Sequence, residues 1–332
     1  MRRLRDIGEF GLIERIERQI QRSREKQIEE RRAGRSAPGV RLGIGDDAAL
    51  LRLRAGEELA VSTDALVEDV HFRWQTQSAV TVGRRAVAVA LSDLAAMGAR
   101  PLGCTLALAA PPELPLRRVD DLIRGIVAEA ERHRCPLVGG NVARASETSL
   151  TLTVLGGVAA GRALRRHSLR AGDRLYVTGV LGAGALALAR CERGATRLRH
   201  LPVPRLAAGR ALAAMGERCA CIDVSDGLLA DLGHLLEGSE LGAELEYDRF
   251  PRPRGFESAC RRLGCDPARL CLAGGEDYEL LFTLPPRVRL PGGSAGRARR
   301  LAVAVTEIGR ITARPGLRGL PELPRAGGWR HF

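Results

Sequence analysis

Residues 79–109 read AVTVGRRAVAVALSDLAAMGARPLGCTLALA, and this stretch decides what kind of fold the chain adopts. Apolar residues recur at helical spacing over 79–97, and Gly98 followed by Pro101 is a usual end of a helix. The apolar run 102–109, directly after it, predicts a buried strand. A helix that leads straight into a buried strand is typical of a mixed α/β unit.

The same two patterns extend to both sides of this stretch. We expect strands at 42–53, 59–63, 149–158, 174–178, 219–224, 243–247, 278–284 and 302–308, and helices at 116–134, 183–190, 207–215 and 228–236. The charged stretch 21–39 and the Pro-, Gly- and Arg-rich stretch 285–300 are predicted to be loops.

The length of the chain predicts more than one domain. A chain of 332 residues is too long for one small core, because domains average roughly 150 residues. A basic, turn-rich stretch at 161–172 separates the two runs of elements. We therefore expect an α/β protein with mixed sheets and two domains, at 1–160 and 161–332.

The net charge of +13 first suggests a nucleic-acid partner. The basic residues are spread over almost every segment, however, and no aromatic residues are interleaved with them for base stacking. Lys26 is the only lysine, and its polar surroundings match neither a P-loop nor a protein-kinase strand. If the protein handles ATP, it must neutralise the phosphates with arginine or with a metal ion.

Cysteine usage and hydropathy indicate a cytoplasmic protein with no membrane partner. No apolar run approaches the roughly 18 residues that a membrane-spanning helix needs. The eight cysteines are scattered, without a CxxC pair or a histidine at zinc-site spacing. Reduced core thiols are the simplest interpretation.

Acidic residues follow or interrupt apolar segments at five places. These are Asp46-Asp47, Ser62-Thr63-Asp64, Ser92-Asp93, Asp223 to Asp226, and Glu276-Asp277. A carboxylate in an apolar setting is costly unless it is paired or bound to a cation, and Mg²⁺ prefers carboxylate and hydroxyl oxygens. Helix capping would explain Asp64 or Asp226 alone, but it does not explain Asp93 inside a helix.

Two of these places share a short pattern. Residues 63–69 read TDALVED and residues 225–231 read SDGLLAD, so both fit [ST]-D-[AG]-L-x-x-D. We interpret them as two similar strand-to-helix corners, one in each domain.

Seven motifs, taken in order, resemble those of the thiamine-monophosphate kinase family. They are GEFGLI (8–13), GIGDDA (43–48), STDALVE (62–68), HF (71–72), LSDLAAMGA (91–99), DVSDGL (223–228) and GGEDYEL (274–280). The resemblance covers nearly the whole chain. It implies the two-domain fold that is shared with aminoimidazole ribonucleotide synthetase, in which the N-terminal sheets of a homodimer join into a barrel.

The resemblance also implies roles for particular residues. It places several Mg²⁺ ions on Asp47, Ser62, Thr63, Asp64, Asp93, Asp223 and Asp226, with Asn141 where the family often has another acidic ligand. It places ATP at Gly140, Asn141, Arg166 and Ser225, and thiamine monophosphate at His71, Glu276 and Trp329. The N-terminal domain would then bind metal and ATP and form the dimer, and the C-terminal domain would complete the active site.

The implied reaction is direct in-line transfer of a phosphoryl group from ATP to the phosphate of thiamine monophosphate. That phosphate is already ionised, so positioning and charge neutralisation matter more than a general base. Two other classes stay open. One is another ATP-using enzyme of the same fold, such as aminoimidazole ribonucleotide synthetase or a relative of selenophosphate synthetase, although the first cysteine here is Cys104. The other is a basic nucleic-acid-binding protein.

Overall fold

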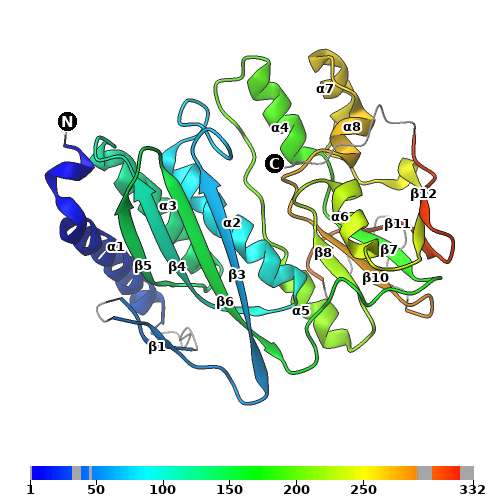
Figure 1. Ribbon diagram of the computed structural model, residues 1–332, viewed down its shortest axis with the longest axis horizontal. Coiled ribbons are helices and arrows are strands. Elements are labelled where there is room, and N and C mark those ends of the chain that lie inside the picture. Colours follow the sequence, from blue (N-terminus) through cyan, green and yellow to red (C-terminus); the bar gives the residue numbers. More distant parts are fainter. Residues whose placement is uncertain (1, 32–38, 45–46, 289, 291–300, 322–332) are drawn as a thin grey trace. The chain divides into compact units, whose positions relative to one another are not determined.

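The computed structural model describes residues 2–31, 39–44, 47–288, 290 and 301–321, and it divides into two compact units (Figure 1). Unit 1 comprises Met1–Leu94 and Arg100–Ala159. Unit 2 comprises Ala95–Ala99 and Ala160–Phe332. The last residues of one helix of unit 1 therefore belong to unit 2.

Unit 1 is built on a four-stranded mixed sheet with two helices on one face (Figure 1). The strand order is β3-β6-β4-β5, in which only the β4–β5 pair is parallel. The elements are β3 (Glu57–Val67), α2 (Ala79–Ala96), β4 (Arg100–Ala110), α3 (Leu116–Arg132), β5 (Leu137–Arg144) and β6 (Ser149–Ala159). The other face of this sheet carries no helix among the described residues.

Glycines allow the two helices of unit 1 to pack closely. A Cβ atom added at Gly83 of α2 would lie 2.2 Å from the carbonyl oxygen of Leu122 on α3. A Cβ added at Gly125 of α3 would lie 2.2 Å from the carbonyl oxygen of Val80 on α2. Real Cβ atoms do not approach backbone this closely, so each glycine is required where the other helix crosses it.

Three expectations for unit 1 are wrong. The strand expected at 42–53 is instead two short paired strands, β1 (Val40–Leu42) and β2 (Leu50–Leu51). The strand expected at 59–63 instead spans Glu57–Val67, because β3 pairs with β6 along its whole length. The loop expected from residue 21 is helical as far as Arg31, in α1 (Gly8–Arg31), which follows the short helix η1 (Leu4–Asp6).

Polar contacts hold the first half of α1 against α3. The guanidinium of Arg15 donates two hydrogen bonds to the carboxylate of Asp120, at 2.9 and 2.6 Å. Gln19 donates to the backbone oxygen of Asp120 at 3.3 Å. The same half of the helix also buries Leu12 and Ile20. Residues 21–31, QRSREKQIEER, have almost no apolar residues, so periodicity did not show their helix, although Gln, Arg, Glu and Lys favour it.

Unit 2 is built on a six-stranded sheet in the order β12-β9-β11-β7-β10-β8, in which only β12 and β9 are parallel neighbours. Its strands are β7 (Arg174–Thr178), β8 (Cys221–Asp223), β9 (Gly242–Leu245), β10 (Leu280–Leu284), β11 (Val305–Thr312) and β12 (Gly316–Arg318). Its helices are α4 (Ala183–Glu192), α5 (Leu206–Met215), α6 (Leu228–Leu236), η2 (Tyr247–Arg249), α7 (Phe256–Leu263) and α8 (Pro267–Leu272).

The sheet of unit 2 is buried on both faces. Leu175, Val177 and Leu281 belong to the main apolar cluster, which includes residues of α4, α6, α7 and α8. The alternate residues Tyr176 and Phe282 are also buried, with their rings stacked 5.5 Å apart. Alternation along each strand therefore gives two apolar layers.

The predicted helices and strands of unit 2 are confirmed in kind, with boundary shifts of a few residues. The structure adds α7, α8 and β12, which the sequence did not reveal because they are short and their apolar positions are few. Within the described residues, no helix combines the length and the apolar character that crossing a membrane requires.

Candidate active site

Strand β3 presents its polar side chains to two different faces of its sheet. Ser62 and Asp64 are half-buried and share the side of Leu66, which is fully buried. Thr63 points the other way, where its Oγ1 lies 2.9 Å from Oγ1 of Thr153 on β6. Because side chains alternate along a strand, these three adjacent predicted ligands do not share one face.

Asp93 lies inside α2 and turns toward β3. The hydroxyl of Ser62 donates a hydrogen bond to Oδ2 of Asp93. A carboxylate in an apolar helix is costly without a polar partner, and Ser62 supplies one. The structure therefore brings Ser62 and Asp93 together, and Asp64 lies two residues along the same face of the strand.

His71 lies in the loop that follows β3, at residues 68–78, and its ring is held in one orientation. The backbone N–H of Val67 donates to Nδ1 of His71 at 3.1 Å. The N–H of His71 donates back to the carbonyl oxygen of Val67 at 2.8 Å. Because a backbone N–H can only donate, Nδ1 carries no proton, and neutral His71 holds its proton on Nε2.

Gly140 and Asn141 lie on β5, at one edge of the sheet of unit 1. A Cβ atom added at Gly140 would lie 2.0 Å from the carbonyl oxygen of Leu106, so the close pairing with β4 requires glycine there. Asn141 is exposed and pairs with Ala107. Asp47 is also exposed, directly after two residues outside the described part of the chain.

The last two predicted site residues are Arg166 and Trp329. Arg166 is exposed in the segment that leads into β7. Trp329, predicted to stack on thiamine, lies outside the described residues.

In unit 2, the carboxylates after β8 gather around one tight turn. Asp223, the last residue of β8, is 5% exposed, and Ser225 and Asp226 follow it. Asp231 of α6 is 2% exposed, and its Oδ2 accepts hydrogen bonds from the N–H groups of Ser225 and Asp226 at 3.0 and 3.1 Å. Asp231 therefore fixes the backbone that presents the two predicted ATP and metal contacts.

The carboxylates of Asp223, Asp226 and Asp231 lie close together, and burial and mutual repulsion disfavour their negative charge. Burial, and then the charges of Asp223 and Asp226, raise the pKa of Asp231 to about 8. The role of Asp231 was not predicted, although the repeated pattern SDGLLAD contained it.

The GGED stretch packs directly against the same turn. The N–H of Glu276 donates to the carbonyl oxygen of Ser225, and the N–H of Tyr278 donates to that of Val224, both at 2.8 Å. Glu276 and Tyr278 both adopt positive φ angles, of 73° and 52°, which residues with side chains seldom do. The structure thus brings the predicted substrate residue Glu276 beside the predicted ATP residue Ser225.

Glycines make this contact possible. A Cβ atom at Gly275 would lie 2.5 Å from the carbonyl oxygen of Ser225. The imidazole Nε2 of His200 lies 2.8 Å from the carbonyl oxygen of Glu276 and so also supports the GGED stretch.

Two buried acids that the sequence did not assign hold the surrounding loops. Asp277 accepts hydrogen bonds from the N–H groups of Gly182 and Gly184, at 2.6 and 3.1 Å, at the start of α4. Glu279 accepts from the hydroxyl of Thr178 at 2.6 Å and makes a two-pronged ion pair with Arg205. These contacts are structural and explain why the GGEDYE stretch is rich in acids.

The repeated pattern of the sequence has two different structures. Residues 225–231 form a strand-to-helix corner, as predicted, between β8 and α6. Thr63 and Asp64 instead lie within β3, and residues 68–78 form a loop before α2, so the prediction of a second corner is wrong. Pairing with β6 along eleven residues outweighs the local turn signal.

The donor atoms at both places fit a hard cation, because they are carboxylate and hydroxyl oxygens. The mutual repulsion of Asp223, Asp226 and Asp231 is what a divalent ion would relieve. By themselves, the described side chains contain no group of three or more His, Cys, Asp or Glu in the arrangement of a metal centre.

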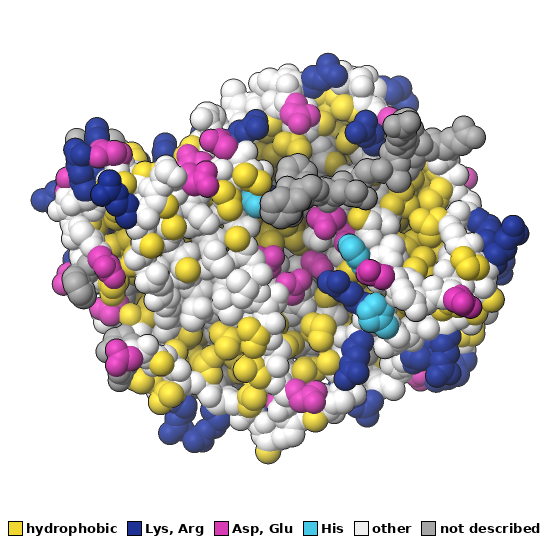
Figure 2. Space-filling model, in the orientation of Figure 1, with side chains coloured by type: hydrophobic (Ala, Val, Ile, Leu, Met, Phe, Trp, Pro, Cys, Tyr) yellow, Lys and Arg dark blue, Asp and Glu magenta, His cyan; other side chains and the backbone are white. Residues whose placement is uncertain are grey.

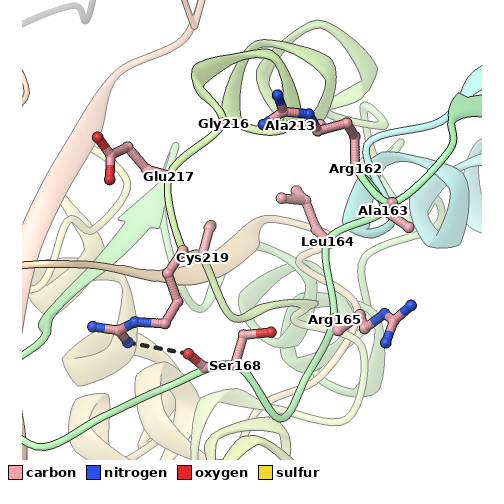
Figure 3. Close-up of a pocket in the computed structure, with 11 residues that line it drawn as sticks. Arg162, Ala163, Leu164, Arg165, Ser168, Ala213, Gly216, Glu217 and Cys219 are labelled. Atoms are coloured by element: carbon pink, nitrogen blue, oxygen red, sulfur yellow. Dashed lines mark hydrogen bonds between the residues drawn. The ribbon is translucent and has the colours of Figure 1, made fainter.

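A separate cavity of about 380 Å³ lies in unit 2, between residues 161–168 and the end of α5 (Figure 3). The guanidinium of Arg162 lies over Gly216, and Arg218 donates to the carbonyl oxygen of Ser168 at 3.1 Å. The residues that line it include Arg165 but none of the predicted site residues. We therefore do not assign it to the active site.

Both units match models of one protein family. Residues 45–158 match the N-terminal domain of AIR synthase related protein, and residues 170–320 match its C-terminal domain. The thiamine-monophosphate kinase of Salmonella typhimurium is 38% identical over 318 residues, which cover 92% of this chain and 91% of that protein. The thiamine-monophosphate kinase of Haemophilus influenzae is 36% identical over 83% of this chain and 85% of that protein.

This chain belongs to the thiamine-monophosphate kinase family. The resemblance seen in the seven motifs is thereby confirmed, and so is the AIR-synthase-type two-domain fold.

Solved structures of the thiamine-monophosphate kinase family have the same fold. The crystal structure of the enzyme from Stenotrophomonas maltophilia has a TM-score of 0.74 and 39% identity, and covers 88% of this chain and 94% of that chain. AaThiL complexed with AMPPCP and TMP also has a TM-score of 0.74, with 27% identity, and covers 100% of this chain and 99% of that chain. HypE of E. coli, a hydrogenase maturation protein, shares the fold alone, at 20% identity and a TM-score of 0.70.

Proposed function

We propose that this protein transfers the γ-phosphoryl group of ATP to thiamine monophosphate, giving thiamine diphosphate and ADP. The observation that carries the proposal is the 38% identity with a named thiamine-monophosphate kinase over more than nine-tenths of both chains. A solved structure of the same family, AaThiL, is complexed with AMPPCP and TMP, an ATP analogue and the proposed substrate. Likeness at this level and over this length favours one shared reaction.

The arrangement of polar residues within each unit supports the assignment. In unit 1, the Ser62–Asp93 pair and Asp64 would hold metal ions, with Asp47 and Asn141 as further ligands. The hydroxyl of Thr63 points to the other face of β3, so the predicted Thr63 side chain is left out of this set. In unit 2, Asp223 and Asp226 would hold metal, while Ser225 contacts ATP. We therefore propose unit 1 as the principal metal- and ATP-binding unit and unit 2 as the unit that completes the site.

Magnesium ions, when bound, would neutralise the two polyanionic substrates and bring their phosphates within reach of each other. The protein's own part is positioning. Asp231 fixes the turn that carries Ser225 and Asp226, and the GGED stretch places Glu276 beside it. Glu276 offers a negative charge that complements the cationic thiazolium of thiamine, and Trp329 would stack on the same ring.

Arginine must do what lysine does in many nucleotide-binding proteins, because the chain has a single lysine, Lys26. Exposed Arg166 and backbone N–H groups beside Gly140 are our candidates for ATP phosphate contacts. The acceptor oxygen is ionised at neutral pH, so we propose direct in-line transfer without a covalent enzyme intermediate. A phosphorylated chain recovered after incubation with ATP alone would contradict this.

A homodimer is part of the proposal. The helix-free face of the sheet in unit 1 exposes Leu59 and Val61 of β3, at 49% and 56%. Over unit 1, Figure 2 shows a surface that is mainly white, for backbone and other side chains, and yellow, for hydrophobic side chains, with few charged side chains near its middle. Such a face favours burial against a second copy of the chain. The eight unpaired cysteines suit a reducing compartment, so we include the cytoplasm in the proposal.

The deciding experiment is a coupled assay of ADP release with ATP, Mg²⁺ and thiamine monophosphate. Thiamine, thiamine diphosphate and the formylglycinamidine substrate of aminoimidazole ribonucleotide synthetase serve as competing acceptors. We expect turnover with thiamine monophosphate only, and none after removal of Mg²⁺ with EDTA. Turnover with the formylglycinamidine substrate instead would replace this proposal by the related synthetase activity.

A further inference from the structure

The GGED stretch, residues 274–277, packs closely against the first turn of α4. A Cβ atom added at Gly184 would lie 2.7 Å from the carbonyl oxygen of Glu276 and 2.8 Å from its Cβ. A Cβ atom added at Gly274 would lie 2.4 Å from the Cβ of Ala185. Both segments need glycine to come this close, so the start of α4 lies directly against the backbone of Glu276.

The side chain of Asp277 joins the same two segments. It is 5% exposed. Its Oδ2 accepts the hydrogen bond from the N–H of Gly182 at 2.6 Å, and its Oδ1 accepts the one from Gly184 at 3.1 Å. Each carboxylate oxygen thus has its own donor at the start of α4. The N–H groups at the N-terminus of a helix also favour a negative charge, so the charge of Asp277 adds to the attachment.

The glycine-rich turn before α4 takes an internal anion. Residues 179–184 read GVLGAG, between strand β7 and helix α4. Such turns bind phosphate groups in many nucleotide-binding proteins, through the N–H groups at the start of the helix. Here two of these N–H groups, of Gly182 and Gly184, donate to Asp277. We therefore interpret this turn as the attachment point of the GGED stretch and not as a site for ATP phosphates.

Asp277 lies between two residues with unusual backbone conformations. Glu276 and Tyr278 have positive φ angles, of 73° and 52°, and such conformations persist only where the surroundings hold them. Their N–H groups attach the backbone to Val224 and Ser225. The side chain of Asp277 attaches the same backbone to a second element, α4. Two separate elements of unit 2 therefore fix the conformation at Glu276.

The carboxylate of Asp277 is costly at this position. Burial raises its pKa to about 7, although hydrogen bonds from the N–H groups of Gly182, Gly184 and Ala183 oppose the shift. An apolar side chain would avoid the cost of burying a charge, but it would leave two buried N–H groups without an acceptor. The hydrogen bonds to α4 are therefore the physical role of this acid.

We propose that Asp277 is a positioning residue for thiamine monophosphate: it attaches the GGED stretch to the start of α4 and so fixes the backbone of Glu276. This inference rests on the proposed function, in which Glu276 meets the thiamine end of the substrate. A displacement of about 1 Å in a binding group is enough to impair the positioning of a substrate. Loss of Asp277 should therefore act first on thiamine monophosphate.

The turn that carries Ser225 and Asp226 has support of its own. Asp231 accepts hydrogen bonds from the N–H groups of both residues, at 3.0 and 3.1 Å. These two contacts do not involve Asp277. We therefore expect the proposed metal and ATP contacts of this turn to stay in place when Asp277 is replaced.

Two substitutions remove the attachment to different degrees. Asp277→Asn keeps the shape of the side chain and one oxygen acceptor, but its NH2 group would face an N–H group of α4. Asp277→Ala removes both acceptors. The matched control is Asp173→Asn, because Asp173 is also buried in unit 2, at 1% exposed. The carboxylate of Asp173 accepts hydrogen bonds from the N–H of Arg170 at 2.8 Å and from the guanidinium of Arg218.

The first experiment compares the steady-state kinetics of the three variants with those of the unaltered enzyme. For Asp277→Ala we expect the KM for thiamine monophosphate to rise about tenfold or more, while kcat and the KM for ATP stay within about threefold. Asp277→Asn should fall between this variant and the unaltered enzyme. Asp173→Asn should leave both KM values unchanged. Equal effects of Asp277→Ala on both KM values, or no effect at all, would overturn the inference.

A second readout does not depend on activity. Hydrogen–deuterium exchange, measured by mass spectrometry, compares peptides that cover 274–280 and 225–231. In Asp277→Ala we expect exchange in 274–280 to become about tenfold faster or more, because the N–H groups of Glu276 and Tyr278 lose their protection. Exchange in 225–231 should not change. Unchanged exchange in 274–280 would show that Asp277 does not hold the GGED stretch.

The two readouts separate this inference from the proposed function. If the unaltered enzyme fails to phosphorylate thiamine monophosphate, the proposed function is wrong, whatever the variants do. The exchange comparison would still decide whether Asp277 holds the backbone of Glu276. If Asp277→Ala does not fold, Asp277→Asn provides both measurements.

Discussion

The hydrogen bond between Ser62 and Asp93 shows how a single residue can be identified before its surroundings are known. An aspartate inside an apolar helix has no local partner, so its position in the sequence alone indicated a tertiary contact. The structure supplies that contact from β3. The sequence predicted Ser62 as a metal ligand but did not predict its hydrogen bond to Asp93, because the residues around Asp93 do not indicate which distant residue contacts it.

At this scale we predict that Asp93→Asn lowers kcat/KM about a hundredfold or more while the protein stays folded. The amide keeps an acceptor for Ser62 but loses the negative charge that a divalent ion requires. The measurement is the ADP-release assay over a range of Mg²⁺ concentrations, with circular dichroism as the check on folding. Activity close to that of the unaltered enzyme would remove Asp93 from the metal site.

At the scale of elements, the crossing of α2 over α3 depends on two glycines. Alanine normally stabilises a helix by about 1 kcal/mol relative to glycine. At Gly125 the new methyl group would lie 2.2 Å from the carbonyl oxygen of Val80. We therefore expect the steric overlap to outweigh the gain in helix propensity, so that the substitution lowers the free energy of unfolding.

We predict that Gly125→Ala destabilises the protein by about 1–3 kcal/mol in urea unfolding. The matched control is Gly233→Ala on α6, where no atom lies within 4 Å of the added methyl group. That variant should be as stable as the original or slightly more stable. A stabilised Gly125→Ala protein would show that the two helices are packed less tightly than the structure indicates.

A buried carboxylate joins the same two helices. Glu129 of α3 is 2% exposed and accepts hydrogen bonds from Arg84 at 2.8 Å and from His133 at 3.0 Å. Burial by itself raises the pKa of Glu129, but the hydrogen bonds from His133 and Arg84 outweigh it and hold the pKa below 4.5. A lowered pKa means that the unfolded chain binds the proton more tightly than the folded one.

This contribution to stability is present above the unfolded pKa of 4.5 and is lost as the pH falls through the folded value. We predict that Glu129→Gln lowers the free energy of unfolding by about 1–3 kcal/mol at neutral pH. The difference between the two proteins should shrink as the pH falls below 4.5. A difference that stays constant with pH, measured by urea unfolding, would show that the charge of Glu129 contributes nothing.

At the scale of the whole molecule, the structure bears on the oligomeric state. An open sheet face with Leu59 and Val61 exposed favours a homodimer, and a charge placed there would be buried twice at a twofold interface. We predict that Val61→Arg yields a monomer of 35.7 kDa in analytical ultracentrifugation, where the unaltered protein has twice that mass. Leu188→Arg, on α4 and 52% exposed, is the control and should not change the mass. An unaltered protein that sediments as a monomer at micromolar concentration would contradict the dimer.

The sequence by itself determined the mixed α/β class, most helices and strands, and the acids and glycines of the candidate site. It could do so because these depend on local periodicity, on Gly and Pro at element ends, and on the cost of placing charge among apolar residues. Asp93 and the corner at 225–231 are examples that the structure places as expected, in a helix and after a strand.

Only the tertiary structure decided which way each side chain points and what holds it there. Strand pairing carried β3 past Asp64 and turned Thr63 away from Ser62, and helix packing brought Arg85 to His71. The physical reason is that strand pairing and helix packing join residues that lie far apart in the chain. The energies of these contacts outweigh local propensities, and local sequence patterns do not record them.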